Sequence, residues 1–363
     1  MCLLVEYAAY VLGVQSATNL FGTTSKYAPP CPPHTNIPQF SIKPSGTEYR
    51  NKPTENMKNI LLISLLFAGW ESGAIAQKWT IELDSVLQDI EKEGFVDGQI
   101  LIAENGKVLF NNAYGSRGAD TLHTPISKDT PLPVFSVGKS FTALSIMRLE
   151  SQGLIHYDDN LRKFIPELPY EKVTIRHLLT MTSGLPRFLE TALKHADTTT
   201  VISNPGILKL IAQHQPSAGM PGEKFEYNNS NYILLALIIE RVSGLSFTAF
   251  LDQYIFQPLG MNHTYETVPS TLERLSQSAT NADNFYQPYG TGTVATTATD
   301  LFQYDQALYS DQLLDGEQIS AAFECVELTD RSSSNYGFGW RIVDCGTLKE
   351  VYHVGDGPGI RSS

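Results

Sequence analysis

Residues 136–139 read Ser-Val-Gly-Lys, and the rest of the chain is best interpreted outward from them. They place a hydroxyl and an amine three residues apart at the start of a predicted helix, so the two side chains share one face and can interact. A serine is a weak nucleophile until a neighbour takes its proton, which a lysine with a lowered pKa can do. The stretch therefore predicts a nucleophile, Ser136, with Lys139 as its base. The alternative is a chance Ser-x-x-Lys on a solvated helix face.

The overall composition is that of a globular protein. The chain has 363 residues, 42% hydrophobic and 18% charged, which is enough for one large or two ordinary domains. The formal net charge of -12 argues against nucleic acid as a partner, because an acidic protein repels phosphate backbones. No apolar run is long enough to span a bilayer. The sequence has no C-x-x-C or H-E-x-x-H motif, which argues against those zinc sites.

Residues 57–76, MKNILLISLLFAGWESGAIA, have the features of a secretory signal peptide. Lys58 precedes an apolar core, and a small-residue cleavage site, Ala-Ile-Ala, precedes Gln77. The alternative is a short buried helix. The signal predicts that the mature protein is exported, to the periplasm or the medium.

Residues 1–56 are rich in Pro, Thr, Ser and Asn and show no sustained periodicity. Because a signal peptide works at the N-terminus, we interpret Met57 as the true start and leave residues 1–56 unassigned. A genuine disordered extension is the alternative. Cleavage of the signal peptide would remove Cys2 and Cys31 and leave Cys325 and Cys345. These two could form a disulfide in an oxidising compartment.

Hydrophobic periodicity predicts an α+β fold. Apolar residues over 79–92 recur at helical spacing. Asn105-Gly106 separates two β-rich runs, which predicts a hairpin over 98–110. The chain is mostly helical between 157 and 281, and strands return at 336–343 and 350–354. We therefore expect one antiparallel sheet, built from both ends of the chain and flanked by helices, with a mostly helical region inserted.

A second group of candidate residues precedes a long apolar helix. Tyr227 and Asn229 lie just before residues 232–242, which are apolar nearly all round and therefore predicted to be buried. A tyrosine can shuttle a proton once a neighbouring cation lowers its pKa, and an asparagine can hold a lysine or a substrate carbonyl. The alternative is that Asn229 or Ser230 caps the helix and the tyrosine only packs.

A third group, His353-Val354-Gly355, lies at the end of a predicted strand. A glycine there lets a ligand approach the backbone closely, and a donor at the strand edge could bind a carboxylate or an oxyanion. Alone this pattern is weak, because most strand histidines are structural.

Ser-x-x-Lys, Tyr-x-Asn and His-x-Gly, in this order, resemble the motifs of the β-lactamase-related serine hydrolases. This family includes class C β-lactamases, low-molecular-weight penicillin-binding proteins, D-Ala-D-Ala carboxypeptidases, related esterases and D-aminopeptidases. The resemblance extends to longer blocks at 135–143, 174–186 and 221–227, and covers roughly residues 80–363. No Gly-x-Ser-x-Gly elbow occurs, which argues against an α/β-hydrolase.

The resemblance implies hydrolysis through an acyl-enzyme. Ser136 would attack a carbonyl, and Lys139 and Tyr227 would together take its proton. Tyr227, with His353, would return a proton to the leaving group. Asn229 would orient Lys139 or the substrate amide.

The resemblance also implies how the substrate is held. The oxyanion would lie against the backbone N–H groups of Ser136 and Asp356, with Gly355 lining the same site. No metal or cofactor is needed. The substrate would be a small molecule or peptide with an ester, amide or β-lactam carbonyl. The alternatives are a penicillin-binding sensor that is acylated without turnover, and an inactive fragment.

The sequence departs from the family pattern in three places. The third motif is His-Val-Gly, where most of the family has Lys-Thr-Gly and uses the lysine and the threonine hydroxyl to hold a substrate carboxylate. Val354 has no hydroxyl and His353 is expected to be only partly charged at neutral pH, so we do not expect efficient β-lactam hydrolysis. Arg341 or Arg361 would have to supply the missing cation. Met181 stands where the family often has histidine, outside the proposed chemistry. The chain stops at Ser363, so we expect the C-terminal strands and helix to be missing and a strand edge to be left unpaired.

Overall fold

The computed structural model describes most of the chain from Gly73 onward and one short segment before it. The described residues are 7–12, 73–94, 96–116, 124–188, 191, 194, 203–214, 218–267, 288–344, 349–357 and 360–363. They fall into two compact units, one formed by Met1–Ser16 with Gly94–Ser363 and the other by Ala17–Glu93.

In the smaller unit the structure describes helix α2 (Gly73–Lys92). This helix confirms the one predicted over 79–92 and begins six residues earlier. The predicted signal peptide at 57–76 lies outside the described residues, except for its last four, which form the first turn of α2.

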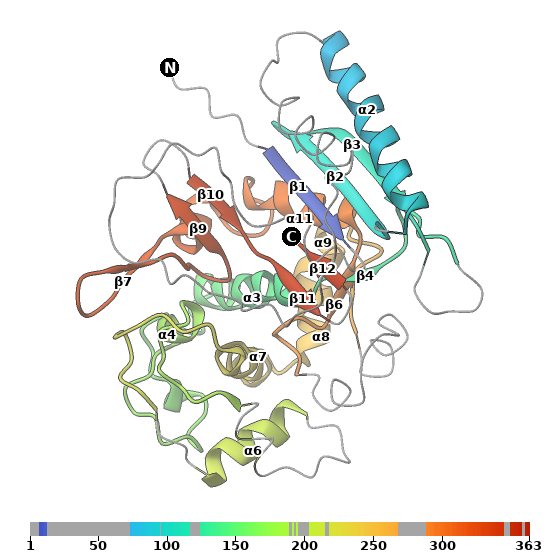
Figure 1. Cartoon of the computed structure of the whole chain (residues 1–363). Coiled ribbons are helices and arrows are strands. Elements are labelled where there is room, and N and C mark those ends of the chain that lie inside the picture. The colour runs from blue at the N-terminus through green and yellow to red at the C-terminus, as the bar shows by residue number, and fades with distance from the viewer. Residues whose placement is uncertain are drawn as a thin grey trace, which may run out of the picture. The chain divides into compact units, whose positions relative to one another are not determined.

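The larger unit contains an antiparallel five-stranded sheet in the order β11-β12-β1-β2-β3 (Figure 1). Its strands are β1 (Tyr7–Leu12), β2 (Gly98–Glu104), β3 (Lys107–Tyr114), β11 (Gly355–Gly357) and β12 (Ile360–Ser362). A sheet assembled from both ends of the chain confirms the predicted α+β fold.

The predicted hairpin is formed by β2 and β3. Its turn residues Asn105 and Gly106 have φ angles of 49° and 72°, which is the left-handed region that this turn type requires. Asparagine and glycine tolerate that region better than other residues do, so the local sequence determines the turn.

Strand β1 corrects an expectation about the sheet edge. It belongs to the segment that sequence reasoning left unassigned, yet it pairs with β2 from Tyr7 opposite Glu104 to Leu12 opposite Gln99, and Leu12 also faces Ser362 of β12. Strand β11 in turn pairs with β12. The edge that we expected to be unpaired is therefore paired, and the remainder of residues 1–56 lies outside the described residues.

Helices occupy the middle of the chain, as predicted. They are η1 (Phe135–Gly138), α3 (Lys139–Ser151), η2 (Leu161–Lys163), α4 (Ile175–Leu179), α6 (Asn204–His214), α7 (Asn229–Ser243), α8 (Phe247–Leu251), the π-helix η3 (Asp252–Phe256), α9 (Gln257–Leu259), α11 (Ala298–Leu308), α12 (Gly316–Ser320) and η5 (Ala321–Phe323).

Short strands form three further antiparallel sheets. They are β4 (Leu132–Pro133), β6 (Val294–Thr296) and β5 (Tyr265–Glu266) in one sheet, β7 (Val326–Glu327) with β8 (Ser333–Ser334), and β9 (Arg341–Asp344) with β10 (Lys349–Tyr352). The strand predicted at 336–343 thus begins only at Arg341, and it pairs with β10 rather than joining the main sheet.

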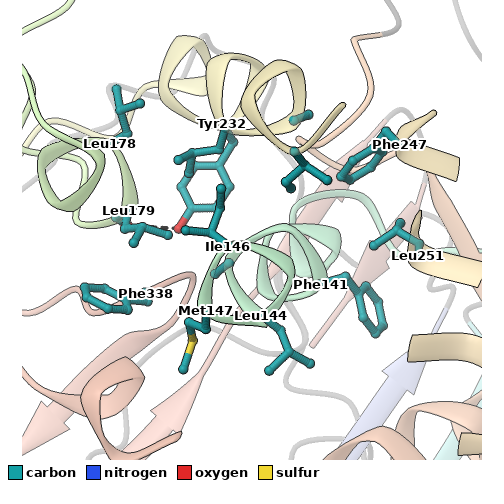
Figure 2. Packing of buried hydrophobic residues seen from close by; sticks show 14 of the residues in the cluster. Phe141, Leu144, Ile146, Met147, Leu178, Leu179, Tyr232, Phe247, Leu251 and Phe338 are labelled. Atoms are coloured by element: carbon teal, nitrogen blue, oxygen red, sulfur yellow. Dashed lines mark hydrogen bonds between the residues drawn. The ribbon is translucent and has the colours of Figure 1, made fainter. Parts of the chain in front are cut away.

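The core lies around α3 and α7. Figure 2 shows Tyr232 of α7 reaching past Ile146 of α3 to Leu179 at the end of α4, where its hydroxyl donates to the Leu179 carbonyl at 2.9 Å. Residues 230–239 of α7 are all buried, as the apolar pattern predicts. Among the described residues no single helix is long and apolar enough to cross a membrane. One pair of segments, α7 and residues 247–259, passes that test only together and with a bend of 77°.

Candidate active site

Ser136 lies on a tight turn immediately before α3. It belongs to the 3-10 helix η1, in which side chains three residues apart lie one above the other, so it faces Lys139. The preceding residue, Phe135, has a φ of 44°, which is strained for a bulky side chain. Gly292 packs against this turn so closely that a Cβ there would come within 2.4 Å of the Phe135 backbone. Ser136 is thus on a strained turn that its neighbours hold in place.

Lys139 is completely buried and makes two hydrogen bonds. Its Nζ donates to Ser136 Oγ at 2.9 Å and to the Thr291 carbonyl at 2.6 Å. Burial, and secondly the positive charge of Arg341, lower the pKa of Lys139 to about 7. A lysine of this pKa is largely neutral just above pH 7, so its lone pair can accept the serine proton while an N–H stays on Thr291.

Tyr227 lies against the same serine. Its hydroxyl is close enough to Ser136 for that side chain to affect its pKa, and its ring has Lys139 Nζ 5.1 Å and Arg341 Cζ 5.4 Å from the centroid. Burial raises the pKa of Tyr227 to about 12, although Ser136 and Arg341 partly oppose this. The expectation that a neighbouring cation lowers this pKa overall is therefore wrong, because desolvation outweighs the charge. At neutral pH Tyr227 is a phenol and holds its proton.

Asn229 is the first residue of α7 but not its cap. The N-cap is Asn228, whose side chain accepts from the Ser230 N–H at 2.9 Å, so the capping alternatives at positions 229 and 230 are wrong. The Oδ1 atom of Asn229 is buried without a hydrogen-bond partner among the described residues. Lys139 donates to the Thr291 carbonyl and not to Asn229, so the Asn229 side chain is available to bind a substrate amide.

His353 is buried and neutral. It follows the last residue of β10, and its Nδ1–H donates to the Val354 carbonyl at 2.9 Å. Nε2 is then an acceptor, 3.1 Å from the Tyr336 hydroxyl. Burial first, and the charge of Lys139 second, lower the pKa of His353 to about 3. The expected partial charge at neutral pH is therefore wrong, and both ring nitrogens are already occupied.

Gly355, two residues after this histidine, brings β11 against the turn that carries Ser136. A Cβ on Gly355 would lie 2.1 Å from the Val134 carbonyl oxygen, so only glycine allows this approach of the two backbones. Asp356 is exposed, and its carboxylate accepts from Arg361 Nε at 2.9 Å. The assignment of the Ser136 and Asp356 N–H groups to an oxyanion stays a prediction.

Arg341 and Arg361, the two candidates for a cation that binds a substrate carboxylate, lie in different surroundings. Arg361 is engaged by Asp356, whereas Arg341 begins β9 and is stacked on Tyr227 beside Ser136. Arg341 is partly buried, and no carboxylate within the described part of the chain forms an ion pair with it. Of the two arginines, Arg341 is therefore the one whose charge lies beside Tyr227 and acts on Lys139.

The site includes two residues that the sequence does not predict, Thr291 and Tyr336, and it is contacted by a third, Met181, that was expected to lie outside the chemistry. Thr291 acts through its backbone carbonyl, and its only sequence signal is the glycine on either side of it. Tyr336 is a fully buried partner of His353 with no motif of its own. Met181, assigned to a position outside the chemistry, in fact contacts the loop that carries Tyr227.

The cysteines and the possible metal ligands add no further group to the candidate site among the described residues. Cys325 is a partly buried free thiol, and Cys345 lies outside the described residues, so their pairing stays a prediction. Within the described ranges, no three His, Cys, Asp or Glu side chains converge as metal ligands.

Comparison with known proteins gives consistent matches. A family model described as Beta-lactamase matches residues 83–363. The chain is 32% identical over 302 residues to Penicillin-binding protein 4* of Bacillus subtilis (strain 168); the match covers 76% of this chain and 66% of that protein's length. An octameric penicillin-binding protein homologue from Pyrococcus abyssi has a similar structure, with a TM-score of 0.62 and 25% identity over 77% of this chain and 72% of that one. The D-amino acid amidase from Ochrobactrum anthropi SV3 shares the fold, with a TM-score of 0.55 and 23% identity over 70% of this chain and 81% of that one.

The buried neutral state of His353 predicts a pH dependence of stability. Below pH 6.5 the unfolded chain protonates this histidine while the folded protein does not until about pH 3, so stability falls as the pH falls through that window. The contribution is about 1.4 kcal/mol per pH unit. We expect His353→Gln to lose less stability than the wild type between pH 7.5 and pH 5, measured by chemical denaturation. Equal losses in both proteins would contradict a neutral His353.

Proposed function

The chain belongs to the β-lactamase family, and we propose that it is a serine hydrolase that cleaves an acyl substrate through a covalent acyl-enzyme. The observation that carries this proposal is the 2.9 Å hydrogen bond between the buried Lys139 amine and Ser136. A buried lysine with a pKa of about 7 has no structural advantage in a protein core, where a charged amine is costly, but suits a general base.

The proposed reaction has two steps. Neutral Lys139 takes the Ser136 proton as Oγ attacks the carbonyl carbon, and the Thr291 carbonyl holds the resulting ammonium. The proton then passes by way of the Tyr227 hydroxyl to the leaving group, which departs as the acyl-enzyme forms. Water attacks the ester and gives a proton to Lys139, which passes this proton to Ser136 Oγ as the serine leaves and the acid is released. His353 donates no proton, because its one N–H is on Val354.

The N–H groups of Ser136 and Asp356 are proposed to hold the oxyanion. The dipole of the helical turn favours negative charge at the Ser136 N–H. The close approach of β11 to the nucleophile turn, seen at Gly355, supports a second donor from the same strand. The unpartnered Oδ1 of Asn229 supports a role in holding the substrate amide.

For the substrate, we propose an ester, amide or β-lactam that carries an anionic group. The support is Arg341, whose guanidinium lies over Tyr227 without a carboxylate partner among the described residues. An arginine binds a carboxylate in two-point geometry, which would replace the missing hydroxyl of Val354. The name of the Bacillus relative makes penicillin, which has a carboxylate, one candidate ligand.

The nucleophile and its base can be tested with p-nitrophenyl acetate and nitrocefin. Ser136→Ala is expected to abolish hydrolysis, and Lys139→Ala to lower kcat/KM by roughly 10²–10⁴-fold, the usual contribution of general base catalysis. In the wild type the rate of acylation should rise as the pH passes through about 7, where Lys139 loses its proton. Lys172→Ala, at an exposed position, serves as the control.

Activity that persists in Ser136→Ala would refute the nucleophile, and an unchanged rate in Lys139→Ala would refute the base. A stoichiometric adduct on Ser136 that never turns over would indicate the alternative function, a non-hydrolytic sensor. A wild-type chain that is folded but is not acylated would indicate an inactive fragment.

Arg341→Gln tests the anion site. We expect KM for a substrate with a carboxylate to rise about tenfold, the loss of a charged hydrogen bond, with little change for a neutral ester. Because Arg341 also lowers the pKa of Lys139, the pH profile of acylation should move to higher pH. Arg361→Gln is the matched control, since this arginine is held by Asp356. If Arg341→Gln and Arg361→Gln changed KM equally for the carboxylate substrate and for the neutral ester, the assignment of Arg341 to the anion site would be contradicted.

We further propose that the protein is exported, on the support of the signal-like residues 57–76. Cleavage before Gln77 would also remove β1, so export with cleavage and a sheet containing β1 exclude each other in one molecule. N-terminal sequencing of the secreted protein is expected to begin at Gln77. Recovery of only the form that begins at Met1 would refute cleavage.

A further inference from the structure

We propose that Met181 is a positioning residue that holds Tyr227 against the nucleophile; this inference rests on the proposed acyl-enzyme function. Met181 lies two residues after the end of α4 and is 1% exposed. It touches neither Ser136 nor Lys139 by any hydrogen bond, and it acts through the main chain on both sides of Tyr227.

Three hydrogen bonds join Met181 to the segment that carries the tyrosine. The Met181 carbonyl accepts from the Glu226 N–H at 2.9 Å, and the Met181 sulfur accepts from the Asn228 N–H at 3.3 Å. The same sulfur lies 3.5 Å from the Asn231 side-chain nitrogen in the first turn of α7. The peptide N–H groups immediately before and after the tyrosine position are therefore both held by one residue.

The backbone of Met181 is in an unusual conformation that makes this possible. Its φ is 57°, in the left-handed region that side chains other than those of glycine, asparagine and aspartate seldom adopt. The Met181 N–H donates to the Leu178 carbonyl, and the next N–H, of Thr182, donates to the His177 carbonyl, so the end of α4 fixes the turn. A strained residue persists only where its surroundings determine it, and such residues occur often at functional sites.

Neighbouring hydrogen bonds fix the two ends of residues 222–231, the loop that carries Tyr227. The Gly222 N–H donates to the Thr182 carbonyl at 2.8 Å, and the Asn228 side chain donates to the Leu185 carbonyl at 2.7 Å. The Ser183 hydroxyl donates to the Asn231 side chain. The loop is thus held at both ends, and Met181 holds it at its centre.

This position matters because Tyr227 must be placed accurately to share a proton with Ser136. A side chain on a loop is only as well placed as the backbone beneath it, and small displacements are costly in proton transfer. A thioether is a weak acceptor, but leucine, which has nearly the same volume, is none. Met181→Leu would therefore leave the buried Asn228 N–H without a partner while keeping the packing.

The test compares Met181→Leu with Met181→His, which restores an acceptor, and with Met147→Leu, the same substitution at a buried position in α3. In p-nitrophenyl acetate hydrolysis, Met181→Leu should lower kcat about tenfold with KM within about twofold, as expected when a group acting in the transition state is displaced. Met181→His should recover most of kcat. Met147→Leu should match the wild type, because this core exchange conserves volume.

Two further measurements separate this inference from the proposed function. Failure of a fluorophosphonate probe to label Ser136 in the wild type would contradict the acyl-enzyme proposal itself. Hydrogen exchange of residues 225–231 does not depend on activity, and it should be faster in Met181→Leu and restored in Met181→His. Unchanged exchange, or a kcat lowered equally by Met181→Leu and Met147→Leu, would overturn the role of Met181.

Discussion

Burial of the Lys139 amine is the constraint on which the rest of the site depends. Removing an ammonium from water is costly, and within the described part of the chain two acceptors, Ser136 Oγ and the Thr291 carbonyl, offset this cost. The protein lessens the cost by lowering the pKa of Lys139 to about 7, so that the neutral amine is well populated at neutral pH. The surrounding core, with residues 230–239 of α7 all buried, keeps water away from this group.

The other titratable groups of the site respond to the same desolvation. Tyr227 and His353 are both driven to their neutral forms, the first by a raised pKa and the second by a lowered one. Arg341 is then the charge that remains in the centre of the site, and it acts on all three neighbours. The carboxylate that also acts on Tyr227, Asp356, is paired with Arg361, and Arg341 has no ion-pair partner among the described residues.

The residues that could be predicted from the sequence are those whose chemistry is local. Ser136 and Lys139 share a face at a spacing of three, and Asn105-Gly106 determines its own turn. Thr291 and Met181 could not be predicted in the same way, because a backbone carbonyl carries no residue signature and a thioether acceptor looks like any core methionine. The pKa of Tyr227 was predicted in the wrong direction, because neighbouring charge can be guessed from a sequence but the extent of burial cannot.

The pairing of β1 between β2 and β12 has a consequence for the order of folding. The first strand of the sheet and its last two strands are separated by almost the whole chain, so their contacts close a very long loop and form slowly. On the ribosome, Ser136 and Lys139 would emerge long before β11, which packs against the nucleophile turn. The surroundings of Ser136 would therefore stay incomplete until β11 has emerged, and synthesis itself would delay their assembly.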